Sequence, residues 1–270
     1  MGSKKDSSWR DSIPDLSVAL PFLAGKSRFK QWLRNFAAWV TAFDKGGKIT
    51  AKAHELNPDA ANPFIGIAEL SHLNVVGDGS LPSGPLVVVA NHPTGCMDGI
   101  SYGKWLLEQR LDTLILTTDA LVTIPSFKNH VIGLSLYGGE QAARRNAKSL
   151  RRAMQHLNQG GCIAAFPAGT ISWMQDDGVV RDGAWMLSVF EIALRCRVPV
   201  ACLRIDAHHQ RTMEYFLSLH PLVRTFLLGR TFTAACNTTH RMILRGVIPA
   251  EAYGDAASLA AAARQLVDPL

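Results

Sequence analysis

The segment that most constrains the fold is NHPTGCMDG at residues 91–99. It follows an apolar run at 86–90, which predicts a buried strand, and it leads into residues 100–110, which predict a helix. His92 and Asp98 therefore lie together at a strand-to-helix corner that a proline and two glycines shape. A carboxylate beside an imidazole can set its tautomer and favour its protonated form, as general-base catalysis requires. The alternative is a surface histidine and an aspartate at a helix start, which is the commoner arrangement for any single pair.

A second segment, FPAGTIS at residues 166–172, also follows an apolar run that predicts a strand, at 162–165. Its proline and glycine predict a turn, and Gly169 lets the backbone approach a ligand closely. Thr170 and Ser172 add hydroxyl groups. A strand that ends in Pro-x-Gly-Thr is common in α/β proteins, but its combination with the first segment is much more specific.

The two segments resemble the motifs of the glycerolipid (lysophospholipid) acyltransferase superfamily, which are His-x4-Asp and a later Phe-Pro-Glu-Gly-Thr. They look most similar to the branch of hemolysin-like and lyso-ornithine-lipid acyltransferases, where NHPxGxxDG and FPAG are usual. The resemblance covers roughly residues 64–249. It implies that His92 is the catalytic base and that Asp98 orients it. It also implies a substrate-binding role for Asn91, Gly95, Phe166, Pro167, Gly169 and Thr170.

The chain departs from the superfamily pattern at two places. Five residues separate His92 from Asp98 instead of four, and we expect Gly95 to let the turn bulge so that the carboxylate still reaches the ring. Ala168 and Ile171 stand where many members have Glu and Arg, which help to bind the glycerol phosphate of the acceptor. The loss of that charged pair favours an acceptor without the phosphate, such as a lyso-aminolipid.

The five cysteines contain no C-x-x-C pair, which argues against a disulfide scaffold or a zinc site and favours a reducing compartment. Cys96 lies inside the first motif and leaves a covalent route open, although no second base is evident beside it. His208 and His209 follow Asp206, but neighbours at a strand end point to opposite sides, so we expect a loop and no metal. Trp173 and Trp185 could line an acyl groove, but such rings are more often part of a core.

Basic residues exceed acidic ones, with a net charge of +6 and a pI near 9.2, which favours anionic partners. Several of the cations share a predicted helix at 140–158. Members of the superfamily often carry an Arg near this place that contacts an anionic headgroup, so the resemblance makes Arg144 or Arg145 our candidate for contact with an anion. A solvated basic face is the commoner meaning of such a pattern. The same face could dock an acidic acyl carrier protein or anionic lipid headgroups.

Apolar runs alternate with helical patterns along the chain, which predicts an α/β fold with three layers and a mainly parallel sheet. The strands are expected at 86–90, 114–118, 133–137, 162–166, 200–205 and 242–247, and the helices at 99–110, 140–158, 183–197, 211–219 and 256–267. Residues 1–62 are expected to form a polar tail and an amphipathic helical segment, and residues 63–270 the acyltransferase domain. Aromatic residues line one side of the helix at 28–43, which fits either an interfacial membrane helix or a helix packed on the domain.

No apolar run is long enough to span a bilayer, and the polar start lacks the apolar core of a signal peptide. The expectation is therefore a cytoplasmic protein that is peripheral on the inner face of the membrane. It would transfer an acyl group from acyl carrier protein (acyl-ACP) or coenzyme A (acyl-CoA) to the hydroxyl of a lysolipid, with no cofactor, no metal and no nucleic acid. The alternatives are an inactive lipid-binding protein of the same fold and, since no G-x-S-x-G is present, less favourably a hydrolase.

Overall fold

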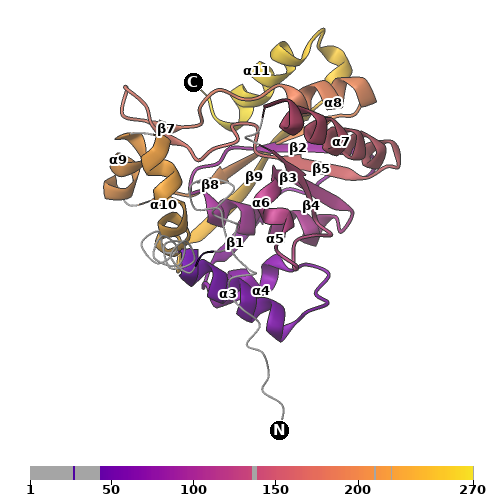
Figure 1. The fold of residues 1–270 in the computed structure, drawn as a ribbon. Coiled ribbons are helices and arrows are strands. Elements are labelled where there is room, and N and C mark those ends of the chain that lie inside the picture. Colours follow the sequence, from indigo (N-terminus) through magenta and orange to yellow (C-terminus); the bar gives the residue numbers. More distant parts are fainter. Residues whose placement is uncertain (1–26, 28–42, 136–138, 210, 220, 270) are drawn as a thin grey trace.

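The computed structural model describes residue 27 and residues 43–269 except 136–138, 210 and 220. A seven-stranded sheet in the order β1-β9-β8-β2-β5-β3-β4 crosses the molecule (Figure 1). All neighbouring strands in it are parallel except β8 and β9, which run antiparallel with a register shift between Cys202 and Leu203. A separate hairpin pairs β6 with β7. The predicted α/β class with a mainly parallel sheet is confirmed.

The strands are β1 (Asn74–Asp78), β2 (Leu86–Ala90), β3 (Thr113–Thr118), β4 (Val131–Leu134), β5 (Cys162–Ala165), β6 (Trp173–Met174), β7 (Val180–Arg181), β8 (Val200–Asp206) and β9 (Thr239–Ile248). The helices are α3 (Phe43–Leu56), α4 (Phe64–Leu70), α5 (Cys96–Gln109), α6 (Asp119–Val122), α7 (Gly139–Asn158), α8 (Ser188–Cys196), α9 (Arg211–Leu219), α10 (Pro221–Ala234), η3 (Ala250–Ala252) and α11 (Ala256–Val267).

Two apolar cores cover the two faces of the sheet, which makes the fold three-layered. Alternate residues of β2 divide between them: Leu86, Val88 and Ala90 join the core beneath α4, α5 and α6, whereas Val87 and Val89 join the core beneath α7, α8 and α11. Every residue of β2 is buried, as expected for a central parallel strand that helices cover on both faces. In Figure 1 the two helical layers lie on opposite sides of the sheet.

The structure differs from the sequence expectations in several elements. The helix expected at 183–197 begins only at Ser188, because the residues before it form a loop whose polar groups are bound to other parts of the chain. Sequence analysis also missed the edge strand β1, which is mostly exposed and so lacks an apolar alternation, and the helix α10. The amphipathic helix expected at 28–43 lies almost wholly outside the described residues.

Within the described part of the chain, no helix combines the length and the apolar character that a membrane crossing requires. The helix α3 packs against α4 and α10, and its Ala53 and Ile49 contact the core beneath α5. This helix therefore closes one side of the region that the next section describes.

Candidate active site

His92 and Asp98 meet where β2 ends and α5 begins. The Nδ1 atom of His92 lies 2.9 Å from Oδ2 of Asp98. The Asp98 side chain is fully buried, whereas the His92 side chain is 19% exposed. The Nε2 atom of His92 has no hydrogen-bond partner among the described residues, so one ring nitrogen is oriented by a carboxylate and the other is free for a substrate.

The loop itself holds the Asp98 carboxylate. The backbone N–H groups of Thr94 and Gly95 donate to Oδ2 at 2.7 and 2.8 Å, and the Thr94 hydroxyl donates to Oδ1. Burial alone raises the pKa of Asp98, but the hydrogen bond and charge of His92, with a further contribution from His240, lower it below its ordinary value. Asp98 is therefore ionised at neutral pH and can stabilise a protonated His92.

Gly95 explains how the carboxylate reaches the ring across five intervening residues. Its φ of +79° is a conformation that side-chain-bearing residues rarely adopt, and it turns the chain just before α5 begins. A Cβ atom at this position would lie 2.9 Å from Oγ1 of Thr231 on α10. The turn brings the first turn of α5 back over residues 94–95, so that Asp98 contacts both their N–H groups and the imidazole.

The second motif lies directly against the first. The rings of Phe166 and His92 stack with centroids 4.2 Å apart and planes inclined by 9°. The backbone N–H of Ser172 donates to the carbonyl oxygen of His92 at 2.8 Å, and the His92 N–H donates to Oδ1 of Asp182 at 3.1 Å. The two loops after β2 and β5 thus form one surface around the imidazole, as parallel neighbouring strands require.

The other expected residues of these loops have identifiable places. Asn91 is buried, and its side chain exchanges two hydrogen bonds with the backbone of Ile205, which ties the loop to β8. The Pro167 carbonyl accepts the N–H of Met186, and Gly169 has a φ of +65°. Gly169 and Thr170 are exposed, so they form the open side of the second loop.

Two buried histidines lie beside Asp98, a position that sequence analysis did not predict for either His240 or His209. His240, on β9, has Nδ1 2.9 Å from Oγ of Ser101 and 3.8 Å from Oδ1 of Asp98. Since the Ser101 hydroxyl donates to the Asp98 carbonyl, the Nδ1–H of His240 donates to Ser101. His209 contacts the Thr94 carbonyl through Nε2 at 3.1 Å. Burial lowers the pKa of both histidines, which keeps them neutral around the charged carboxylate.

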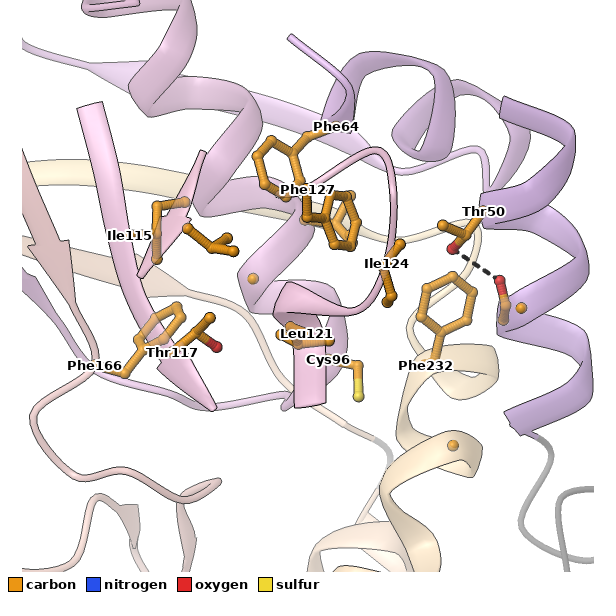
Figure 2. A pocket seen from close by; sticks show the side chains of 16 residues that line it. Thr50, Phe64, Cys96, Ile115, Thr117, Leu121, Ile124, Phe127, Phe166 and Phe232 are labelled. Carbon is orange, nitrogen blue, oxygen red and sulfur yellow. Dashed lines mark hydrogen bonds between the residues drawn. The ribbon is translucent and has the colours of Figure 1, made fainter. Parts of the chain in front are cut away.

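An apolar cavity of about 130 Å³ lies next to the first turn of α5 (Figure 2). Phe166, which stacks on His92, forms part of its wall, and Cys96 and Gly99 contribute from the two sides of Asp98 along α5. The rest of the lining comes from β3, β4, α3, α4, α6, α10 and the loop after α6, and includes the stacked rings of Phe64 and Phe127. The lining is almost wholly apolar and therefore suits a hydrocarbon chain.

The cysteine of the first motif does not have the properties of a nucleophile. Burial and the negative charge of Asp98 raise the pKa of Cys96 to about 12, so its thiol stays protonated. Its side chain faces the apolar cavity, as Figure 2 shows. These properties argue against a covalent route through Cys96.

The two candidate arginines of α7 differ in their surroundings. The Nε atom of Arg145 donates to Oγ of Ser135 at the end of β4, at 3.0 Å. Arg144 points outward and pairs with Glu140 in an ion pair whose side chains are both about four-fifths exposed. Only Arg145 is anchored at the edge of the sheet where the two motif loops lie.

Three further predictions concern groups outside the motif loops. His208 is exposed beside Asp206, whereas His209 is buried, so the two neighbours do point apart. Among the described residues, no three His, Cys, Asp or Glu side chains form a group that could hold a metal ion. Trp185 belongs to the core beneath α7, α8 and α11. The ring of Trp173 lies under the guanidinium of Arg224, whose Cζ atom is 3.9 Å from the ring centroid.

Comparisons with known proteins agree with this geometry. The chain is similar to the crystal structure of the 1-acyl-sn-glycerophosphate (LPA) acyltransferase PlsC from Thermotoga maritima, with a TM-score of 0.50 and 17% identity over 93% of this chain and 89% of that one. At this identity the likeness shows the fold. No curated protein matches the chain. The family model described as Acyltransferase matches residues 72–206, which are half of the chain and contain both motifs. The chain therefore belongs to the acyltransferase family.

Proposed function

We propose that this protein is a lysolipid O-acyltransferase that takes a fatty acyl group from a thioester, acyl-ACP or acyl-CoA, at the membrane surface. The observation that carries the proposal is that Phe166 forms both a wall of the apolar cavity and the stacking partner of His92. A hydrocarbon chain in the cavity would therefore bring its carbonyl group to the catalytic base.

The reaction follows from the orientation of His92. Its Nε2 takes the proton of the acceptor hydroxyl as the oxygen attacks the thioester carbonyl carbon, and Asp98 stabilises the resulting imidazolium. When the tetrahedral intermediate collapses, the carbon–sulfur bond breaks and the imidazolium gives its proton to the leaving thiolate. No enzyme nucleophile is needed, in agreement with the protonated state of Cys96.

The acceptor is proposed to be a lysolipid without a free phosphate monoester, such as a lyso-ornithine lipid, or a related lysophospholipid. Support comes from Ala168 and Ile171, which supply no charge in the second loop. Ile171 is buried and Ala168 packs against the core beneath α7 and α8, so neither position contacts a headgroup through a charge.

The donor carrier and the membrane are proposed partners of two different surfaces. On α7, Lys148, Arg151 and Arg152 are exposed and form no ion pair with any described residue, which suits an acidic carrier protein or the phosphates of coenzyme A. On α9, Tyr215, Phe216 and Leu219 are each at least half exposed, as at a surface that contacts lipid. A peripheral location on the inner face of the membrane, in the cytoplasm, fits these surfaces.

The first test replaces His92 with alanine. We expect transfer to a panel of lysolipids, from acyl-ACP and from acyl-CoA, to fall by about 10³-fold or more because the proton acceptor is lost. Product formation is measured by mass spectrometry, in vitro and in the lipids of cells with and without the protein. His208→Ala is the matched control, since His208 is exposed and lies outside the site.

Three outcomes would contradict the proposal. Transfer by His92→Ala at the wild-type rate would remove the base from the mechanism. Tight lysolipid binding by the wild-type protein with no product would favour the inactive lipid-binding alternative. Release of free fatty acid in the absence of any lysolipid would indicate a hydrolase.

The second test examines the cavity at Gly99, where an added Cβ would have no atom within 4 Å. Because the residue lines the cavity, Gly99→Leu should fill part of it without a clash at the helix. We expect kcat/KM for long acyl donors to fall by about tenfold relative to short ones, because the leucine side chain would occupy the space of a few methylene groups of a long acyl chain. Gly99→Ala is the graded control, and an unchanged chain-length profile in both variants would place the acyl chain elsewhere.

A further inference from the structure

Asp182 is a buried carboxylate that neither motif contains, yet it binds the loops of both. It lies in the segment between β7 and α8 and is 2% exposed. Its Oδ1 accepts the backbone N–H of His92 at 3.1 Å and the hydroxyl of Ser172 at 2.5 Å. Its Oδ2 accepts the indole N–H of Trp185 at 2.9 Å. Both oxygens are therefore occupied by donors from three separate places in the chain.

Ser172 completes the connection from its backbone. While its hydroxyl donates to Asp182, its N–H donates to the carbonyl oxygen of His92 at 2.8 Å. The N–H and the carbonyl of His92 are thus both held by this pair, and the imidazole is placed between Phe166 on one face and Asp98 at Nδ1. A shift of the His92 backbone would move the ring relative to both.

The same aspartate is anchored on its far side by the end of α11. The Asp182 N–H donates to Oδ2 of Asp268 at 2.8 Å, and Arg264 donates to the Asp182 carbonyl at 2.7 Å. Arg204 on β8 in turn donates to the Val267 carbonyl. Asp268 and Arg264 lie beyond the 72–206 region that the family model matches, so the C-terminal helix holds the residue that binds the His92 backbone.

We propose that Asp182 is a positioning residue for acyl transfer, which holds His92 at the distance and angle where its Nε2 meets the acceptor hydroxyl. The inference rests on the proposed function. Asp182 acts through the His92 backbone and touches no substrate, so its loss should lower kcat and leave the KM values for donor and acceptor nearly unchanged. Small displacements of a catalytic group are enough for such an effect.

The test uses Asp182→Asn together with Trp185→Phe. An asparagine keeps one acceptor oxygen, but its amide N–H group then faces either the Trp185 indole N–H or the His92 N–H, and two donors oppose each other. We expect Asp182→Asn to lower kcat by about tenfold or more, with each KM changed by less than about threefold. In the double variant the phenyl ring removes the competing indole donor, so the amide oxygen can turn to His92 and Ser172.

Rescue is therefore the decisive observation. The kcat of Asp182→Asn/Trp185→Phe should return to within about threefold of Trp185→Phe alone, which a general loss of packing would not produce. Asp255→Asn, which alters an exposed carboxylate at the start of α11, should leave kcat unchanged. An unchanged kcat in Asp182→Asn, or no recovery in a folded double variant, would overturn the proposal.

A further variant and a second readout cover the case in which Asp182→Asn does not fold. Ser172→Ala removes one donor and leaves the carboxylate in place, and we expect a smaller fall in kcat, of about three- to tenfold; an unchanged kcat would also overturn the proposal. Hydrogen exchange of the His92 amide, slow in the wild type and faster in Ser172→Ala and Asp182→Asn, reports on the hydrogen bonds without any substrate. If the wild type proves inactive, the proposed function fails while this readout still tests the role of Asp182.

Discussion

Two buried aspartates contact His92, and their pKa values are shifted in opposite directions. Asp98, in the first turn of α5, binds the imidazole and has a pKa below its ordinary value. Asp182, in the loop before α8, binds the backbone of the same residue, and burial, aided by the neighbouring Asp268, raises its pKa. Both side chains are almost completely buried, so burial alone does not decide the charge state.

The difference lies in what surrounds each carboxylate. Asp98 has the titratable ring of His92 at hydrogen-bond distance and His240 behind it, so its negative charge is matched when the ring accepts a proton. Asp182 has a hydroxyl, an amide and an indole as donors and a second carboxylate, Asp268, nearby. In the proposed mechanism, the first arrangement serves proton transfer, and the second holds the His92 backbone in place.

The largest effect that would sharpen this comparison is expected from Asp98→Asn. The amide cannot stabilise an imidazolium, and its N–H group favours the wrong tautomer of His92, so kcat should fall by roughly 10³- to 10⁴-fold. The same change at Asp182 is expected to cost far less, because only a position is lost. Both variants are assayed for kcat side by side, and an effect at Asp182 as large as that at Asp98 would break the distinction.

The ring itself offers a check that is independent of turnover. In the wild type we expect the ¹⁵N shifts of His92 to report a protonated Nδ1 and a free Nε2, since Nδ1 faces the Asp98 carboxylate. Asp98→Asn should alter this pattern and Asp182→Asn should preserve it. If both variants altered it equally, the two aspartates would not have separate roles.

The sequence identified one aspartate and not the other for a physical reason. His92 and Asp98 lie on one short loop, where the glycine and proline pattern makes a turn predictable, and a turn alone brings them together. Asp182 is 90 residues away from His92 and binds a backbone N–H, a group that every residue but proline carries. His240 reaches Asp98 only because β9 returns beside β8 in antiparallel register, which no local pattern encodes.

The fold shows the same difference between features that a local sequence pattern determines and features that contacts with distant segments determine. The buried strands β2 and β5 and the long helix α7 were predicted nearly residue for residue, because their apolar runs and helical periodicity are strong. The start of α8 was misplaced by five residues, since residues 183–187 were expected to be helical but lie in a loop in which Trp185 donates its indole N–H to Asp182. Tertiary hydrogen bonds decided the structure there, and they could not be deduced from the segment itself.

The smallest expected effect concerns Asp268, the carboxylate that anchors Asp182 from α11. Burial raises the pKa of Asp268 above the value of about 3.9 that an unfolded chain has. The native state therefore holds the proton more tightly than the unfolded state, and this group's contribution to stability is present below that value and is lost as pH rises through the native pKa. Asp268→Asn removes the titration but keeps an oxygen that can accept the Asp182 N–H.

The free energy of unfolding of Asp268→Asn should accordingly increase relative to wild type as the pH rises from 4 towards the native pKa of Asp268, and the difference should then level off. Urea denaturation at a series of pH values measures it. Asp255 supplies a control of opposite sign on the same helix, because the N–H of Ser258 lowers the pKa of this N-cap carboxyl. As the pH rises through the acid range, Asp255→Asn should therefore become less stable relative to wild type. Equal slopes for the two variants would mean that the native state does not raise the pKa of Asp268.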